Sequence, residues 1–192
     1  MHDIPPLIAS VDTLKEIAEL SSYNLRIPER AATKGQRHVS VTDSKGNVTQ
    51  ELNPKFTAAW TEKMEVVESK MLMSDHIQHK GEVECRIKFR VIDNENNGRP
   101  FSVRYFIAPD ELPANRPNSD RRKMTYISCG RLNALLRAAG WGEIGGTDID
   151  YREYFSGDKP TVIGAIVNAS VRHYVNEGQE YQDVQDFKSP VT

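Results

Sequence analysis

The sequence lacks the features that would tie the chain to a membrane or to an oxidising compartment. No apolar run approaches the roughly 20 residues that span a bilayer, and the stretch Met1 to Pro6 has no cationic segment followed by an apolar one, so we expect no secretory signal. Only two cysteines are present, Cys85 and Cys129, and we interpret them as buried free thiols in a reducing cytoplasm. These absences predict a cytoplasmic protein that does not contact a membrane.

The sequence also lacks a recognisable catalytic motif. There is no Gly-x-Ser-x-Gly, no glycine-rich loop with a lysine to hold phosphate, and no paired-histidine motif. One predicted loop carries Asp75, His76 and His79, but it has neither a fourth ligand at a usual spacing nor a cysteine partner. We therefore predict no enzyme activity, no cofactor and no metal site.

One acidic cluster leaves an alternative open. Asp148, Asp150 and Glu153 lie in a predicted connector and could hold Mg²⁺, as the carboxylates of a nuclease do, if another carboxylate converged on them. Acidic residues in a connector are more simply explained as solvated side chains.

The whole chain has little net charge, but one segment of it has an excess of positive charge. The formal net charge is −2. The stretch from Lys80 to Arg131 contains eleven Lys and Arg against seven Asp and Glu, a local net of +4, and the remainder carries −6. A polyanion responds to the local potential, so this stretch is the candidate for binding one.

The clearest secondary-structure signal is the strict alternation from Glu82 to Asp93. Apolar residues at Val83, Cys85, Ile87, Phe89 and Val91 alternate with Glu82, Glu84, Arg86, Lys88 and Arg90. A period of two over this length predicts a strand with one buried and one solvent-facing side. The solvent-facing side ends in three cations.

The elements after residue 60 predict a mainly β fold with one capping helix. We expect strands over Lys63–Met73, with a bulge where Glu68-Ser69-Lys70 breaks the alternation, then Glu82–Asp93 and Pro100–Ala108, a helix over Ser128–Ala139 that Gly140 closes, and strands over Thr161–Val175 and Glu180–Phe187. Strand-strand-strand-helix-strand-strand is the element order of the OB-fold, a five-stranded barrel that binds oligonucleotides on its second and third strands.

The first 55 residues read as an N-terminal helix and β-hairpin attached to this barrel, which we assign to residues 56–192. Thr13 and Glu16 form a capping box that would begin a short helix, and such a helix must dock on something to be stable. Two alternating stretches, 38–42 and 47–52, flank a turn with Gly46 and predict the hairpin.

Fold order and charge together nominate a nucleic-acid-binding face. Cations that track phosphates and flat rings that stack on bases are what binding to single strands requires. The nominated residues on the second and third strands are Arg86, Lys88, Arg90, Arg104 and Phe106. We expect the basic run Arg121, Arg122 and Lys123 to extend this track from a loop before the helix, and Arg172 and Tyr174 to repeat the pairing of cation and ring near the last hairpin. The competing explanation is a solvated strand face that discourages edge pairing.

Four segments resemble a family of phage proteins long filed as a domain of unknown function. They are Lys88–Asp93, Asn97–Phe101, Arg131–Gly140 and Gly178–Phe187, in the family's order of strand, Gly-Arg turn, helix ending in Ala-Ala-Gly and closing strand. Members are encoded beside recombination and replication genes and are regarded as OB-type proteins that bind single-stranded DNA. The resemblance covers residues 56–188 and implies DNA binding in an infected bacterial host, but it fixes no contact residue.

We therefore expect a phage-type single-stranded-DNA-binding protein that acts in replication or recombination with little sequence preference. A recombinase, helicase or polymerase of phage or host is a candidate partner, and homo-oligomerisation stays open. The alternative is an OB-fold protein-interaction module that recruits or inhibits a recombination, replication or host factor.

Overall fold

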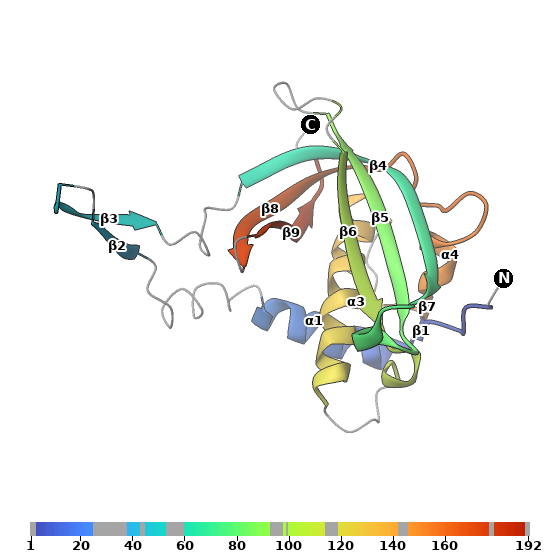
Figure 1. The fold of residues 1–192 in the computed structure, drawn as a ribbon. Coiled ribbons are helices and arrows are strands. Elements are labelled where there is room, and N and C mark those ends of the chain that lie inside the picture. Colours follow the sequence, from blue (N-terminus) through green and yellow to red (C-terminus); the bar gives the residue numbers. More distant parts are fainter. Residues whose placement is uncertain are drawn as a thin grey trace.

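The computed structural model describes residues 3–24, 38–42, 45–52, 60–92, 98, 100–113, 119–141, 146–176 and 179–190. Its main feature is a five-stranded antiparallel sheet with strand order β6-β5-β4-β8-β9, which arches over helix α3 (Figure 1). The strands are β4 (Trp60–Met73), β5 (Val83–Val91), β6 (Pro100–Ile107), β8 (Ile166–Asn176) and β9 (Gln179–Lys188). The predicted order of three strands, a helix and two strands is confirmed.

The predicted faces of β5 and β6 are confirmed on the buried side. All five apolar residues of β5 are buried, and so are Phe101, Val103, Tyr105 and Ile107 of β6. The predicted bulge in β4 is also present, because the pairing of β4 with β5 shifts register between Val66 and Glu68. The extra residue is Val67, whose side chain is exposed.

Aromatic contacts show how strongly the sheet curves. Phe89 of β5 stacks with Phe187 of β9 at 5.7 Å between ring centroids, and it also meets Phe101 of β6 at 6.5 Å. Two strands, β4 and β8, lie between β5 and β9 in the sheet. Rings on β5 and β9 can touch only because the sheet bends around its apolar side.

Helix α3 (Asp120–Ala138) begins eight residues before the predicted start at Ser128. Ser119 caps it by accepting a hydrogen bond from the backbone N–H of Arg122 at 3.0 Å, and this cap makes the basic run part of the first turn. The helix buries Leu132, Leu135 and Leu136 and contacts β6, β8 and β9. Gly140, at φ +91°, follows its end as predicted.

The N-terminal helix α1 (Val11–Asn24) docks on α3, as the sequence predicted for so short a helix. Leu14 and Ile17 belong to the same apolar core as the sheet. The predicted cap at Thr13 is wrong: Ser10 accepts from the Thr13 N–H, while the Thr13 hydroxyl is buried and donates to the Leu112 carbonyl at 2.8 Å. The strand β1 (Ile8–Ala9) pairs with β7 (Ile149–Asp150).

The predicted hairpin is present as β2 (His38–Thr42) paired with β3 (Val48–Leu52). Gly46 in its turn has φ +83°, the conformation that favours glycine. The predicted boundary near residue 55 lies outside the described residues, so the division into two units stays a prediction.

The segment before β8 differs from the prediction. Residues 161–164 form a turn, with Gly164 at φ +85°, so β8 begins at Ile166 and not at Thr161. Ile163 is consequently exposed, and Val162 is buried in its place. The described residues also contain the short helices η2 (Ile77–His79), η3 (Pro109–Glu111) and α4 (Tyr151–Phe155). None of the helices in the described ranges is long and apolar enough to cross a membrane.

Candidate nucleic-acid interface

Five of the cations on the outer side of three neighbouring strands form one group. We call this group the cationic face: Lys70 on β4, Arg86, Lys88 and Arg90 on β5, and Arg104 on β6. The exposed fraction of their side chains runs from 33% for Arg86 to 63% for Arg104. The sequence predicted four of the five. Lys70 was missed because the bulge at Val67 hides which side of β4 it faces.

Three of these cations stand abreast across the sheet. Arg86 is the register partner of Lys70 on one side and of Arg104 on the other. Adjacent strands lie about 4.8 Å apart, and like charges directly opposite each other destabilise a sheet. In the free protein, negative charge must offset the repulsion within such a row. The row also concentrates positive potential where a phosphate could bind.

Glu84, two residues before Arg86 on β5, supplies most of the negative charge that offsets this repulsion. Its two carboxylate oxygens accept from Nε and Nη2 of Arg86 at 2.7 and 2.8 Å, and Nε of Arg104 lies 3.5 Å away. The hydrogen bonds from Arg86 hold the pKa of Glu84 below its usual value, and the same contact raises the pKa of Arg86. We predicted Glu84 on the solvent-facing side, but its side chain is only 1% exposed and is paired with both guanidinium groups.

The other end of the cationic face is paired with carboxylates of β4. Lys88 donates to Glu68 at 2.6 Å, Lys70 lies 3.7 Å from the same carboxylate, and Arg90 pairs with Glu65. The hydrogen bond from Lys88 lowers the pKa of Glu68. Five cations therefore face three carboxylates, which leaves a smaller positive excess than the strand sequences alone suggested.

Phe106 lies on the same side of β6 as Arg104, as predicted, but its ring is half-buried where we expected it exposed. The imidazole of His79, at the end of η2, lies parallel to it with 3.7 Å between ring centroids and 9° between ring planes. His76 stands at a tilt, 6.5 Å from Phe106. The loop from β4 to β5 thus brings two rings onto the end of the cationic face.

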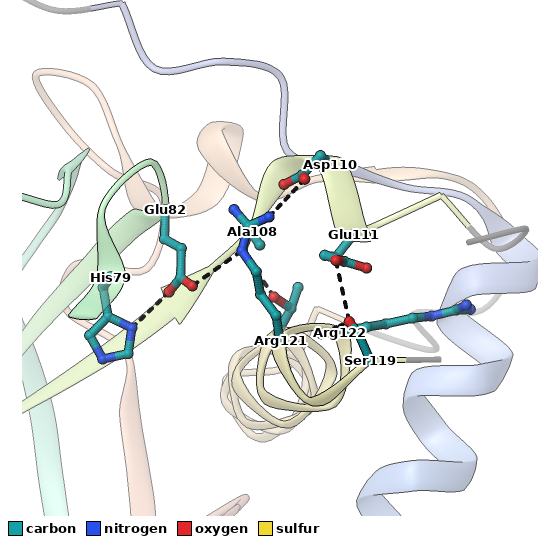
Figure 2. A network of polar contacts seen from close by, with 9 residues as sticks. His79, Glu82, Ala108, Asp110, Glu111, Ser119, Arg121 and Arg122 are labelled. Carbon is teal, nitrogen blue, oxygen red and sulfur yellow. Dashed lines mark hydrogen bonds and ion pairs between the residues drawn. The ribbon is translucent and has the colours of Figure 1, made fainter. Parts of the chain in front are cut away.

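The basic run before the expected helix does not form one continuous track, because successive residues of a helix point in different directions. Arg121 donates to Asp110 at 2.7 Å and lies 3.5 Å from Glu82 (Figure 2). Arg122 is buried, pairs with Glu16 of α1 and donates to the hydroxyl of Tyr126 at 3.0 Å. The third residue, Lys123, is exposed and lies 3.5 Å from Asp120.

Two further nominated residues, Arg172 and Tyr174, belong to β8, where their backbones pair with Asp183 and Tyr181 of β9. Their side chains lie outside the described part of the chain, so their predicted place near the last hairpin stays a prediction. The sequence signals that nominated them were the same as for β5 and β6, a cation and a ring on one side of an alternating strand.

Asp148 and Asp150 of the acidic connector make hydrogen bonds and an ion pair within the fold. Asp148 accepts from the backbone N–H of Val11 at 3.2 Å, and Asp150 caps α4 and binds Arg152. The guanidinium of Arg152 lowers the pKa of Asp150. Within the residues that the structure describes, no group of three or more His, Cys, Asp and Glu side chains is placed to hold a metal ion.

Both cysteines, Cys85 on β5 and Cys129 on α3, are buried and free. Burial raises the pKa of both thiols, that of Cys129 to about 12. A thiol that stays protonated is a poor nucleophile, so these side chains act as core residues.

Sequence comparison adds no identity to this picture. No protein-family model matches the chain, and no curated protein matches it significantly.

Proposed function

We propose that the protein binds single-stranded DNA on the cationic face without catalysis. The observation that carries the proposal is the row Lys70, Arg86 and Arg104, three cations abreast on adjacent strands with exposed ends. A row of cations follows a phosphate backbone, and aromatic rings at its end provide surfaces on which bases stack. Phe106 and His79 stand at that end.

The proposal includes the fold. We infer that the five-stranded sheet is an OB-type barrel, since its element order agrees and its curvature brings Phe89 against Phe187. In that fold oligonucleotides bind on the second and third strands and the loops beside them. Here those strands are β5 and β6, and the neighbouring loop carries His79.

The biological role follows from the resemblance of residues 56–188 to the phage family. We propose that the protein protects or presents single strands during phage replication or recombination, with a recombinase, helicase or polymerase as the protein that works beside it. Affinity would come from phosphate contacts and base stacking, and it would therefore depend on salt and little on base sequence.

The direct test is fluorescence anisotropy with labelled oligothymidine and with a labelled duplex of equal length. We expect tighter binding to the single strand, because stacking needs base faces that a duplex hides. Equal affinity for the two at moderate salt would contradict the stacking part of the proposal. No binding to either at low salt would contradict all of it.

The variant that locates the site neutralises three cations, Lys88→Gln, Arg90→Gln and Arg104→Gln, in one protein. Arg86 is left in place because its loss would leave the buried carboxylate of Glu84 without its main ion-pair partner. For single strands each lost phosphate contact lowers the salt dependence of log K by about 0.7, so we expect the slope to fall by about 2.

A matched control removes charge elsewhere, with Lys15→Gln on α1 and Lys159→Gln after α4, both exposed. We expect this control to bind like the wild type. Unchanged affinity and salt slope in the cationic-face variant would show that Lys88, Arg90 and Arg104 do not contact the DNA, which would contradict the proposed site.

A second candidate function, the protein-interaction module, is favoured by apolar side chains around the β4 bulge. Val67, Ile163 and Ile166 are exposed, and the backbones that carry them are joined by the hydrogen bonds Val66 N–H to Ala165 and Gly164 N–H to Val66. This function predicts that the wild type captures a replication or recombination protein. Capture should be lost in the double variant Val67→Ser/Ile166→Ser and kept in the cationic-face variant.

A further inference from the structure

We propose that the His79 ring is a platform on which a nucleobase stacks, an assignment that rests on the proposed DNA binding and deepens it. The sequence considered this residue only as a weak metal ligand beside Asp75 and His76, and not as a part of the nucleic-acid-binding face. In the structure its ring is stacked parallel to that of Phe106, and both residues are partly exposed.

The geometry of the pair supports this role. The rings are 3.7 Å apart and within 9° of parallel, which is the arrangement of stacked bases. His79 packs one face on Phe106, and 28% of its side chain remains exposed. A base placed on the outer face of the imidazole would continue the stack that Phe106 begins, while the ring beneath it would stay in place.

A hydrogen bond followed by two ion pairs holds the imidazole in that orientation (Figure 2). His79 Nδ1 donates to Oε2 of Glu82 at 2.8 Å, and Oε1 of Glu82 lies 3.5 Å from Nε of Arg121. Arg121 is in turn anchored by its bond to Asp110 at 2.7 Å. Each oxygen of Glu82 therefore has one partner, and the exposed loop is tied to the first turn of α3.

The backbone fixes the same loop a second time. The His79 N–H donates to the carbonyl of His76, the Glu82 N–H donates to the carbonyl of His79, and the Ser74 N–H donates to the carbonyl of Glu82. A ring that is already ordered loses little conformational entropy when a ligand binds. The loop is thus suited to stacking before any strand arrives.

The platform is next to the phosphate-binding row. Phe106 is the register partner of Glu84, the residue whose carboxylate holds Arg86 and Arg104. A strand that crosses the cationic face would bring one of its bases to the edge of the sheet, where the ring pair stands.

The experiment separates base stacking from phosphate binding with two labelled probes of equal length, oligothymidine and an oligomer with the same phosphates but abasic sugars. We expect His79→Ala to weaken oligothymidine binding about 5- to 150-fold, the range for loss of one stacked base, and to leave binding of the abasic probe unchanged. His79→Tyr keeps a flat ring and should restore most of the affinity.

Two control variants of the same loop sharpen the result. Gln78→Ala, an exposed neighbour, should bind both probes like the wild type, and Lys80→Ala should weaken both probes equally because it removes only charge. Circular dichroism and thermal unfolding of each variant show that the fold is kept.

The outcomes are distinct. If the wild type binds and His79→Ala binds oligothymidine equally well, the platform is refuted and the proposed DNA binding stands. The same holds if His79→Ala weakens binding of both probes equally. Tighter binding by His79→Ala also refutes it, because the ring would then be a lid over Phe106. Failure of the wild type to bind either probe refutes the proposed function and the platform with it.

Discussion

Removal of the buried carboxylate of Glu84 should destabilise the protein more than removal of any exposed acid on the same face. Glu84→Gln keeps the shape of the side chain but takes away the charge that receives two hydrogen bonds from Arg86 and lies 3.5 Å from Arg104. Arg86 and Arg104, which are register partners on adjacent strands, would then lose the carboxylate that offsets their repulsion.

The magnitude follows from burial and from the number of bonds. Hydrogen bonds to charged groups contribute about 1.5–3 kcal/mol each. The Arg86 side chain is 33% exposed and regains water, and glutamine still accepts one bond. We therefore expect the free energy of unfolding to fall by about 2–3 kcal/mol, which is closer to the contribution of one such hydrogen bond than of two. For a chain of this size that loss lowers Tm by about 5–10 °C.

Urea unfolding and calorimetry measure this change, with Glu68→Gln as the matched control. Glu68 makes the same kind of ion pairs on the same face, but its side chain is 41% exposed, and exposed pairs contribute little. We expect the control to shift the unfolding midpoint only slightly. Equal shifts for the two variants, or a Tm change under about 2 °C for Glu84→Gln, would refute the reasoning.

The same pair predicts a pH dependence with a definite sign. The pKa of Glu84 in the folded protein lies below its ordinary value of 4.5, because Arg86 stabilises the ionised form. Its contribution is fully present above the unfolded pKa and is lost as the pH falls through the folded pKa. The stability difference between wild type and Glu84→Gln should hold from pH 7 to about 5 and shrink below about 4. A difference that stays constant down to pH 3 would contradict the assigned ion pair.

Three further changes test the core and the helix. Phe89→Ala removes a ring, 1% exposed, that contacts Phe101 and Phe187, and should cost about 3–5 kcal/mol in urea unfolding; a loss under about 1 kcal/mol would mean that the sheet does not close on this ring. Ser119→Ala removes the cap of α3 and should cost about 1 kcal/mol, which Ser119→Asp, another good cap, should restore. Tyr151→Phe leaves the buried amide oxygen of Asn133 without its 2.9 Å bond and should cost about 1–3 kcal/mol, with no effect on oligonucleotide binding.

The local patterns of the chain determined the residues of β5 and β6 and which side of each of these two strands is buried. Alternation is a property of consecutive residues, so the apolar sides of β5 and β6 could be assigned without knowing what they pack against. The same holds for the outward direction of Lys88, Arg90 and Arg104. The helix start was mistaken because three prolines and a basic run suggested a loop, while the cap that begins α3 depends on a single serine.

Only the tertiary structure decided what each cation meets. The carboxylates that pair with Lys88 and Arg90 lie on β4, 20 and 25 residues away in the chain. Which of them stands opposite depends on a register that the bulge at Val67 shifts by one residue. The stacking of His79 on Phe106 likewise joins a loop to a strand through the fold of the β4–β5 turn. The local sequence sets where cations and rings lie along a strand. Which carboxylates pair with the cations, and which side chains cover the rings, depends on other strands and loops that meet only when the sheet has formed.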